Sequence, residues 1–268
     1  MSKFDFRPRL SPKTIAKETL NDCDVKNFPV SLKNICEYYN IYYMEDKLNR
    51  GDEGCSFREK DKYGIIINKD IKNEPRRKFT FAHEIGHVRL SHLKNIKRIN
   101  CSAKDIEDFS NNESREKEAN NFASELILPT QEILPYIKKS NIDIDLIKKI
   151  SEKFGASLTA SAVKIIEISD IPTILVMSKN KKVEWYFTSQ DTNFKYLVPS
   201  GDLSEFTYAF ELFEDNSEYK TEGEIDAEDW LEDRDNKVAD LSSLKEQSVF
   251  LPNYNRVLTI LTFLDPIC

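Results

Sequence analysis

The sequence predicts an α+β protein in two domains: a first domain with a small mixed sheet and a helix that carries paired histidines, then a second α+β domain. Three observations support this. Short β-type segments alternate with amphipathic helical patterns up to about residue 166. The remainder is rich in β-type segments. A chain of 268 residues is long enough for one large or two ordinary domains.

The first domain is expected over residues 1–166, with a loose polar arm at 1–20. Its elements follow from apolar periodicity and from turn and stop residues, such as the proline near a helix start and Pro129 at a helix end. They are a helix and then a strand in Val30–Met44, a hairpin in Gly54–Asn68, a helix that begins near Pro75, a polar loop at Cys101–Ser114, a helix in Arg115–Pro129, and two short helices around Gly155 in Asp145–Ile166.

The second domain is expected over residues 167–268. Ile171–Phe187 predicts a hairpin that turns near Lys179–Lys182, and β-type segments recur at Gln247–Leu251 and Val257–Phe263. Glu211–Asp235 contains twelve acidic and two basic residues, which predicts a solvated acidic loop.

Bulk composition excludes several classes of protein. The net charge of −7 provides no basic footprint for duplex DNA, so strong nucleic-acid binding is not expected. No secretory signal and no apolar run of about 18 residues are present, so we expect no membrane span. The five cysteines are scattered without a CxxC pair, which favours reduced thiols and a cytoplasmic location.

The clearest chemical signal is the pentad His83-Glu84-Ile85-Gly86-His87. On a helix, His83 and His87 project from one face and can share a zinc ion, and Glu84 between them can reach a water bound to that ion. The competing interpretation is an amphipathic helix with two surface histidines. The apolar residues around the pentad argue against it, because histidines buried in such a helix need partners.

A catalytic zinc site needs a third protein ligand and one open position. His92 lies roughly 140° from His87 around a helix, so it does not share the histidine face. Glu116 and Glu118 on the following helix are the candidates. Glu116 lies roughly 50° and Glu118 roughly 110° from the centre of that helix's apolar stripe, so Glu116 is favoured as the ligand. The alternative for either glutamate is an ordinary solvated helix start.

The segments RRKFTFAHEIGHVRLSH and EKEANNFASELILP together resemble the ImmA/IrrE family of metallo-endopeptidases, over roughly residues 25–166. The family motifs are RxxFTxAHExGH and ExEAxxFAxxLLMP. The resemblance implies a zincin-like fold, Zn²⁺ as cofactor, and a helix-turn-helix repressor as the protein substrate, cut to derepress stress or mobile-element genes. Longer members carry a second domain, likened in one branch to a GAF-type sensor.

These parts predict zinc-dependent peptide hydrolysis. Zinc held by His83, His87 and Glu116 lowers the pKa of a bound water, and Glu84 accepts the water's proton and passes it to the leaving amine. The strand Tyr63–Ile67 is expected to border the cleft, where it can pair with an extended substrate; the alternative is a core strand, and the two roles do not exclude each other. Three alternatives remain: a pseudoenzyme or binding module that keeps the zincin fold without hydrolysis, a DNA-binding regulator that uses the helix-turn-helix-like segment Ile150–Ile166, and an antitoxin-like partner that forms a stable complex without cleavage.

Two regulatory hypotheses complete the interpretation. Residues 166–268 are expected to gate the peptidase or to dock its substrate, with the acidic segment attracting the basic face of a DNA-binding repressor. Cys101 lies fourteen residues after His87. If its loop folds back, its thiolate can fill the open zinc position; the alternative is a loop cysteine without a role.

Overall fold

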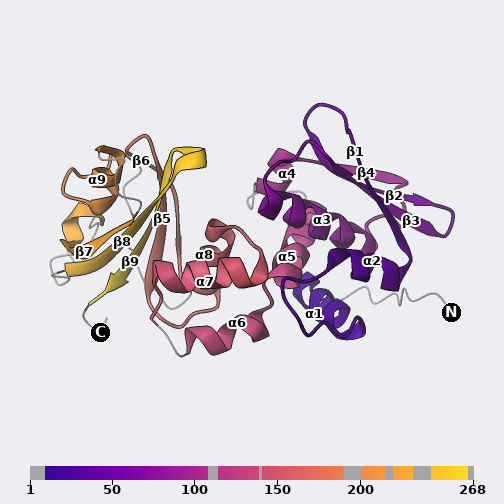
Figure 1. Ribbon diagram of the computed structural model, residues 1–268, viewed down its shortest axis with the longest axis horizontal. Coiled ribbons are helices and arrows are strands. Elements are labelled where there is room, and N and C mark those ends of the chain that lie inside the picture. Colours follow the sequence, from indigo (N-terminus) through magenta and orange to yellow (C-terminus); the bar gives the residue numbers. More distant parts are fainter. Residues whose placement is uncertain are drawn as a thin grey trace. The chain divides into compact units, whose positions relative to one another are not determined.

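The computed structural model describes residues 10–107, 114–138, 141–189, 201–214, 220–231 and 243–264. The chain forms two compact units, each with its own sheet (Figure 1). The first unit comprises Met1–Glu132 and Ile150–Ser157, and the second comprises Ile133–Lys149 and Leu158–Cys268. The single domain boundary near residue 166 stays a prediction.

The first unit has a four-stranded mixed sheet in the order β1-β3-β2-β4. Strand β1 runs parallel to β3, and the other neighbours are antiparallel. The hairpin predicted in Gly54–Asn68 is present as β2 and β3. The strands are β1 (Ile41–Asp46), β2 (Asp52–Glu59), β3 (Lys62–Asn68) and β4 (Arg98–Ser102).

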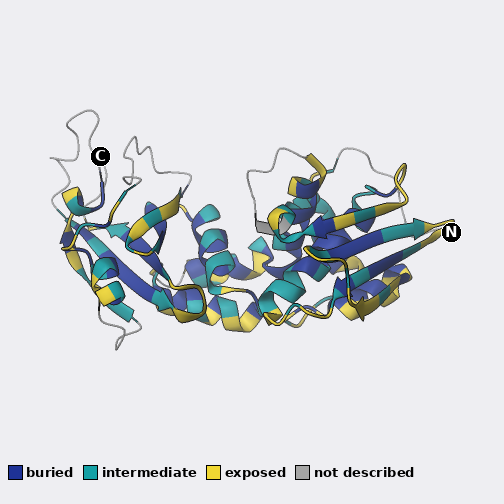
Figure 2. Cartoon of the chain, turned by 90° about the horizontal axis from the view of Figure 1, so that it is seen from above, coloured by how far each residue is buried: buried dark blue, intermediate teal, exposed yellow. Residues whose placement is uncertain are grey.

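Helices complete this unit. They are α1 (Pro12–Asp22), α2 (Leu32–Tyr39), α3 (Glu74–Arg89), α4 (Ala103–Glu107) and α5 (Ser114–Ile127). Helix α3 packs between the sheet and α5, and its middle and C-terminal turns are buried. Buried residues, dark blue in Figure 2, lie along helices and strands in both units.

Two local predictions for this unit were wrong. The arm at 1–20 contains α1, because Ser11 caps the helix by accepting a hydrogen bond from the Thr14 amide and because Ala16 and Leu20 are buried; residues 1–9 lie outside the described part. The loop predicted at Cys101–Ser114 instead begins with the end of β4 and then α4, and residues 108–113 are not described.

The second unit has a five-stranded antiparallel sheet in the order β6-β5-β9-β8-β7. The predicted hairpin is β5 and β6, with Asn180 and Lys181 both at positive φ in its turn. The strands are β5 (Thr173–Lys179), β6 (Lys182–Thr188), β7 (Lys220–Asp226), β8 (Ser243–Leu251) and β9 (Arg256–Phe263). Helix α9 (Tyr208–Glu214) and the short helices η1 (Ala227–Asp229) and η3 (Pro252–Tyr254) accompany them.

Three more helices lie between the sheets in sequence: α6 (Thr130–Ile137), α7 (Ile144–Phe154) and α8 (Leu158–Glu167). Gly155 stands between α7 and α8 at φ +61°, as the predicted turn requires. No helix within the described ranges combines the length and apolar character that a bilayer span needs.

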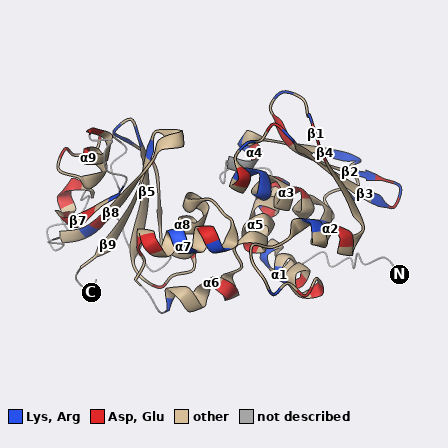
Figure 3. Cartoon of the chain, in the orientation of Figure 1, with Lys and Arg blue, Asp and Glu red and all other residues tan. Residues whose placement is uncertain are grey.

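The acidic segment is not a simple loop where the structure describes it. Residues 211–214 belong to α9 and residues 220–226 to β7, whereas 215–219 and 232–235 are not described. On β7, Glu222, Glu224 and Asp226 are exposed and alternate with more covered positions such as the buried Ile225. Figure 3 shows red acidic segments in the part of the chain where α9 and β7 are labelled. A strand period of two therefore produces an exposed acidic face.

Candidate metal centre

Helix α3 brings the two histidines of the pentad into the interior. Asn73 caps it by accepting a hydrogen bond from the Arg76 amide, and Pro75 occupies its first turn. Arg76 also donates to the Glu53 carboxylate at 2.7 Å, which ties the start of α3 to β2. His83 and His87 are both fully buried, so the prediction of a buried helix face is confirmed.

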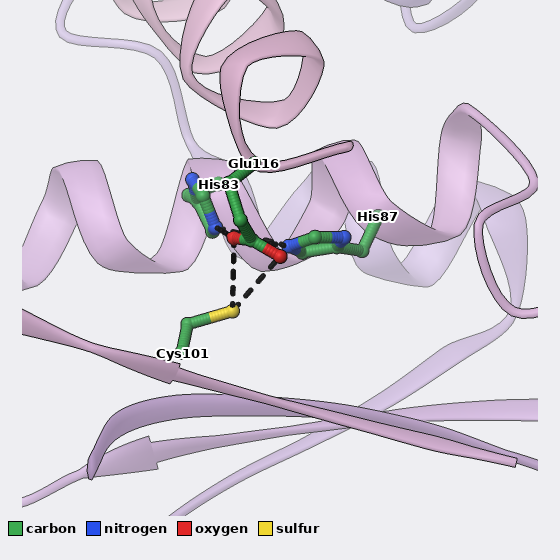
Figure 4. A group of neighbouring side chains, drawn as sticks. All are labelled: His83, His87, Cys101 and Glu116. Atoms are coloured by element: carbon green, nitrogen blue, oxygen red, sulfur yellow. Dashed lines mark hydrogen bonds and ion pairs between the residues drawn. The ribbon is translucent and has the colours of Figure 1, made fainter. Parts of the chain in front are cut away.

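Four side chains from three elements converge beneath α3 (Figure 4). Nε2 of His83 lies 3.0 Å from Nε2 of His87. Oε2 of Glu116, from α5, lies 3.1 Å and 3.3 Å from these two nitrogens. The fourth is Cys101 from β4, and the ligand atoms of the four residues all lie within 4.8 Å of one another.

The second nitrogen of each imidazole has a fixed partner. Nδ1 of His83 lies 2.8 Å from Oδ1 of Asn120. Asn120 donates its own amide hydrogen to the Asp105 carbonyl, which orients Oδ1 toward the histidine as an acceptor. Nδ1 of His83 is therefore the donor, and Nε2 faces the centre of the cluster.

A longer chain of contacts orients the other imidazole. Nδ1 of His87 lies 2.9 Å from Nδ1 of His92, and Nε2 of His92 lies 3.0 Å from Oε2 of Glu118. Since the carboxylate accepts from Nε2 of His92, the other nitrogen of that ring accepts from His87. Nε2 of His87 is then left with a lone pair directed at the centre.

Burial and neighbouring charges shift the pKa values of the side chains in the cluster. Burial lowers the pKa of His87 to about 4 and so keeps that ring neutral. Burial also acts to lower the pKa of His83, but the hydrogen bond to Glu116 and the nearby carboxylates outweigh it, so this pKa is raised. Conversely, burial acts to raise the pKa of Glu116, yet the two histidines hold it well below its usual value. The centre therefore attracts positive charge.

Glu84 projects toward the sheet. It is fully buried, and neither of its carboxylate oxygens has a partner at normal hydrogen-bond geometry among the described residues. Burial raises its pKa to about 7, although the Cys101 thiol and the Ser56 hydroxyl are among the neighbouring groups that act to lower this pKa. A Cβ on Gly54 of β2 would lie 2.4 Å from Oε1 of Glu84, so only glycine leaves room for the carboxylate there.

Gly86 determines how closely the two ligand-bearing helices approach. A Cβ at this position would lie 3.1 Å from the Phe122 ring and 3.3 Å from the Ala119 backbone of α5. Glycine in α3 and alanine in α5 therefore let the helices pack closely, which places Glu116 within reach of both histidines.

The donor set fits a metal ion. Two imidazole nitrogens and a carboxylate oxygen within 3.3 Å of one another, all in the interior, need a cation or a proton between them. The partners of the imidazoles resemble those that orient histidine ligands in metalloproteins. The buried His/His/Cys/Glu group thus can hold a metal ion.

The structure brings together all four predicted site residues, namely His83, Glu84, His87 and Glu116. Glu116 joins His83 and His87, whereas Glu118 turns to His92, as the helix-face argument expects. For Tyr63–Ile67 the core-strand alternative is confirmed and pairing with a substrate was wrong, because β3 lies inside the sheet between β1 and β2 and has no free edge. The roles of His92 and Asn120 were missed; the i, i+4 spacing of Asn120 from Glu116 was the available signal.

Comparisons with known proteins agree with this geometry. Residues 36–165 match the family model described as IrrE N-terminal-like domain (Peptidase_M78). This part of the chain belongs to the ImmA/IrrE family. The IrrE-like domain therefore is a zincin-like, metallopeptidase-type domain, and it contains all four residues of the metal-binding group.

Beyond the family model, several solved structures are similar to the chain, and one of them matches over most of its length. It is a Mycobacterium tuberculosis transcriptional regulator, with a TM-score of 0.59 and 15% identity, and the match covers 94% of this chain and 76% of that one. At this identity the likeness shows the fold alone. A search of curated proteins gives no match.

Proposed function

We propose that this protein is a zinc-dependent endopeptidase whose substrate is another protein, in particular a helix-turn-helix repressor of stress or mobile-element genes. The observation that carries the proposal is the convergence of His83, His87 and Glu116 beside the buried, unpaired carboxylate of Glu84. Zinc in such a site supplies a Lewis acid for the scissile carbonyl and a water of lowered pKa.

The residues of the chain then have separate tasks. His83, His87 and Glu116 hold the ion, and Asn120 and His92 orient the two imidazoles through Nδ1. Glu84 acts as the general base and then returns the proton to the leaving amine. Its raised pKa near 7 suits a group that both takes and gives a proton near neutrality.

The edge of the sheet is the proposed place for the substrate. Strand β4 pairs with β2 on one side, and within the described ranges no strand pairs with its other side. A cavity of about 300 Å³ borders this edge and reaches Glu116. An extended peptide can add to β4 by main-chain hydrogen bonds, as strands do at exposed sheet edges. The residues that line the cavity are Ile96, Arg98, Ile99, Asn100, Asp105, Arg115 and Glu116.

The alternative of a DNA-binding regulator receives less support. Of the two lysines available in the helix-turn-helix-like segment, Lys164 is only 1% exposed, so its ammonium does not face a phosphate backbone. The second unit remains the proposed regulatory or docking module, and its likeness to a GAF-type sensor is part of that proposal.

The test combines metal analysis with cleavage of a candidate helix-turn-helix repressor, taken from the genes that neighbour this one. The wild type should contain about one zinc per chain and cut the repressor. Glu84→Gln should keep the zinc and lose cleavage. Glu116→Ala should lose most of the zinc, whereas the matched variant Glu118→Ala, two residues away, should keep most of it. Cleavage that persists in Glu84→Gln would exclude Glu84 as the base.

A further inference from the structure

Cys101 occupies an unusual place for a buried cysteine. It lies on β4, is fully buried, and faces the metal-binding group rather than an apolar core (Figure 4). Its Sγ lies 3.3 Å from Nε2 of His87 and 3.8 Å from Oε2 of Glu116. By contrast, the equally buried Cys55 on the neighbouring strand contacts the Ser56 carbonyl at 3.8 Å and does not belong to the metal-binding group found among the described residues.

Five of the six separations among the four donor atoms are close to those of ligands that share one ion, and all six lie within 4.8 Å. With metal–ligand bonds of about 2.0–2.3 Å, neighbouring ligands of tetrahedral zinc lie about 3.3–3.6 Å apart. The three contacts among His83, His87 and Glu116 measure 3.0, 3.1 and 3.3 Å. The two distances from the sulfur are 3.3 Å to His87 and 3.8 Å to Glu116. They equal or exceed the distances among the nitrogen and oxygen atoms, as expected for the larger sulfur atom.

We propose that Cys101 is a fourth protein ligand that closes the metal site and holds the peptidase in a latent state. This inference rests on the proposed function, since latency has meaning only for a working peptidase. Catalytic zinc sites keep one position open for water or substrate, whereas sites with four protein ligands are closed and structural. When Cys101 binds, its thiol proton is released to solvent and the sulfur takes the place that the attacking water needs.

The position of the Glu84 carboxylate is a second observation that supports the proposal. Its carboxylate lies against Gly54, and Gly54 is the residue that pairs with Cys101 across the β2–β4 ladder. Neither carboxylate oxygen has a partner at normal hydrogen-bond geometry among the described residues although the side chain is fully buried, and the Cys101 thiol is one of the polar groups next to it. The proposed base and the thiol therefore lie side by side at the position where water would be activated.

The end of β4 pairs irregularly with β2. The pairing of β2 with β4 shifts register between Asp52 and Gly54, next to Cys101, so the ladder is interrupted there. Such bulges bend a strand and often terminate pairing beside active sites. Moving Ser102 and Cys101 away from the ion would open the fourth position without any covalent change.

The test uses the full-length protein loaded with zinc for X-ray absorption and with cobalt(II) for optical spectroscopy. The wild type should show one sulfur in the first shell at about 2.3 Å, with a thiolate-to-cobalt charge-transfer band. Cys101→Ser and Cys101→Ala should lose both signals. Cys55→Ser, a matched control from the next strand, should keep both. A first shell of nitrogen and oxygen alone in the wild type would overturn the proposal.

Cleavage of the partner repressor provides the second readout. At equal zinc content, Cys101→Ser should cut several-fold faster than the wild type without any inducing signal, and Cys55→Ser should cut at the wild-type rate. Equal rates for Cys101→Ser and wild type would refute latency. If the sulfur is present but no variant ever cuts, the proposed function fails and the fourth ligand stands. If Glu84-dependent cleavage occurs with no sulfur in the shell, the proposed function stands and this inference fails.

Discussion

Replacing Glu84 with glutamine should make the metal-free protein more stable, not less. The Glu84 carboxyl is fully buried and has no partner at normal hydrogen-bond geometry among the described residues. Burial raises its pKa from 4.5 to about 7. The folded state therefore holds the proton more tightly than the unfolded state does. The raised pKa therefore lowers the free energy of unfolding only where Glu84 ionises. This loss is absent below the unfolded pKa, grows between the two pKa values, and is complete above the folded pKa.

The size of this cost follows from the two pKa values. Each pKa unit corresponds to about 1.4 kcal/mol, so a pKa raised from 4.5 to about 7 lowers the free energy of unfolding by about 3 kcal/mol at alkaline pH. Glutamine has nearly the same shape as the protonated acid and never ionises. Glu84→Gln should thus be about 3 kcal/mol more stable than wild type at about pH 8 and nearly equal to it at about pH 4.5.

The assay must report on the unit that holds the site. Both tryptophans, Trp185 and Trp230, belong to the second unit, so their fluorescence does not follow the unfolding of the first. We would instead unfold the chelator-treated protein in urea and follow α3 by pulsed hydrogen exchange of its peptides. Glu59→Gln is the matched control, because Glu59 is exposed at the end of β2, and it should change stability by less than about 0.5 kcal/mol at either pH.

A pH-independent difference between Glu84→Gln and wild type would refute the reasoning, because only ionisation of the buried carboxyl makes the difference grow with pH. A Glu84→Gln protein less stable than wild type at about pH 8 would refute it too. Either result would mean that Glu84 is solvated or paired in the folded state. The expected outcome instead identifies Glu84 as a group kept for function at the expense of stability.

Three further predictions test other contacts. His92→Phe removes the acceptor of the His87 Nδ1 hydrogen and should weaken zinc affinity about 10–100-fold in a competition titration, whereas unchanged affinity would deny His92 an orienting role. Gly54→Ala places a Cβ 2.4 Å from Oε1 of Glu84, so it should abolish most cleavage while zinc content stays near wild type; full activity would show that the carboxylate position is unimportant. Neutralising Glu224 and Asp226 on the acidic face of β7 should slow repressor cleavage at low salt and matter less at high salt, and equal effects at both ionic strengths would discard docking through this face.

The sequence by itself determined the parts of the site that depend on local geometry. The spacing of His83 and His87 needs only a helix, and the choice of Glu116 over Glu118 needs only the apolar stripe of its own helix. The hairpins and the paired helices around Gly155 follow in the same way from turn residues and periodicity. Each of these features is encoded within about one or two dozen neighbouring residues.

The tertiary structure decided what depends on distant partners. Strand order removed Tyr63–Ile67 from the sheet edge and placed β4 there, because pairing between strands is not encoded in either strand alone. The bond from Asn120 to His83 and the chain from Glu118 through His92 to His87 join α5 with α3 and the turn after it. Cys101 reaches the ligands because its segment joins the sheet as β4 rather than forming a loop. These side chains come from segments that are far apart in the sequence. Their distances are set by helix packing and strand pairing, which the sequence spacing does not determine.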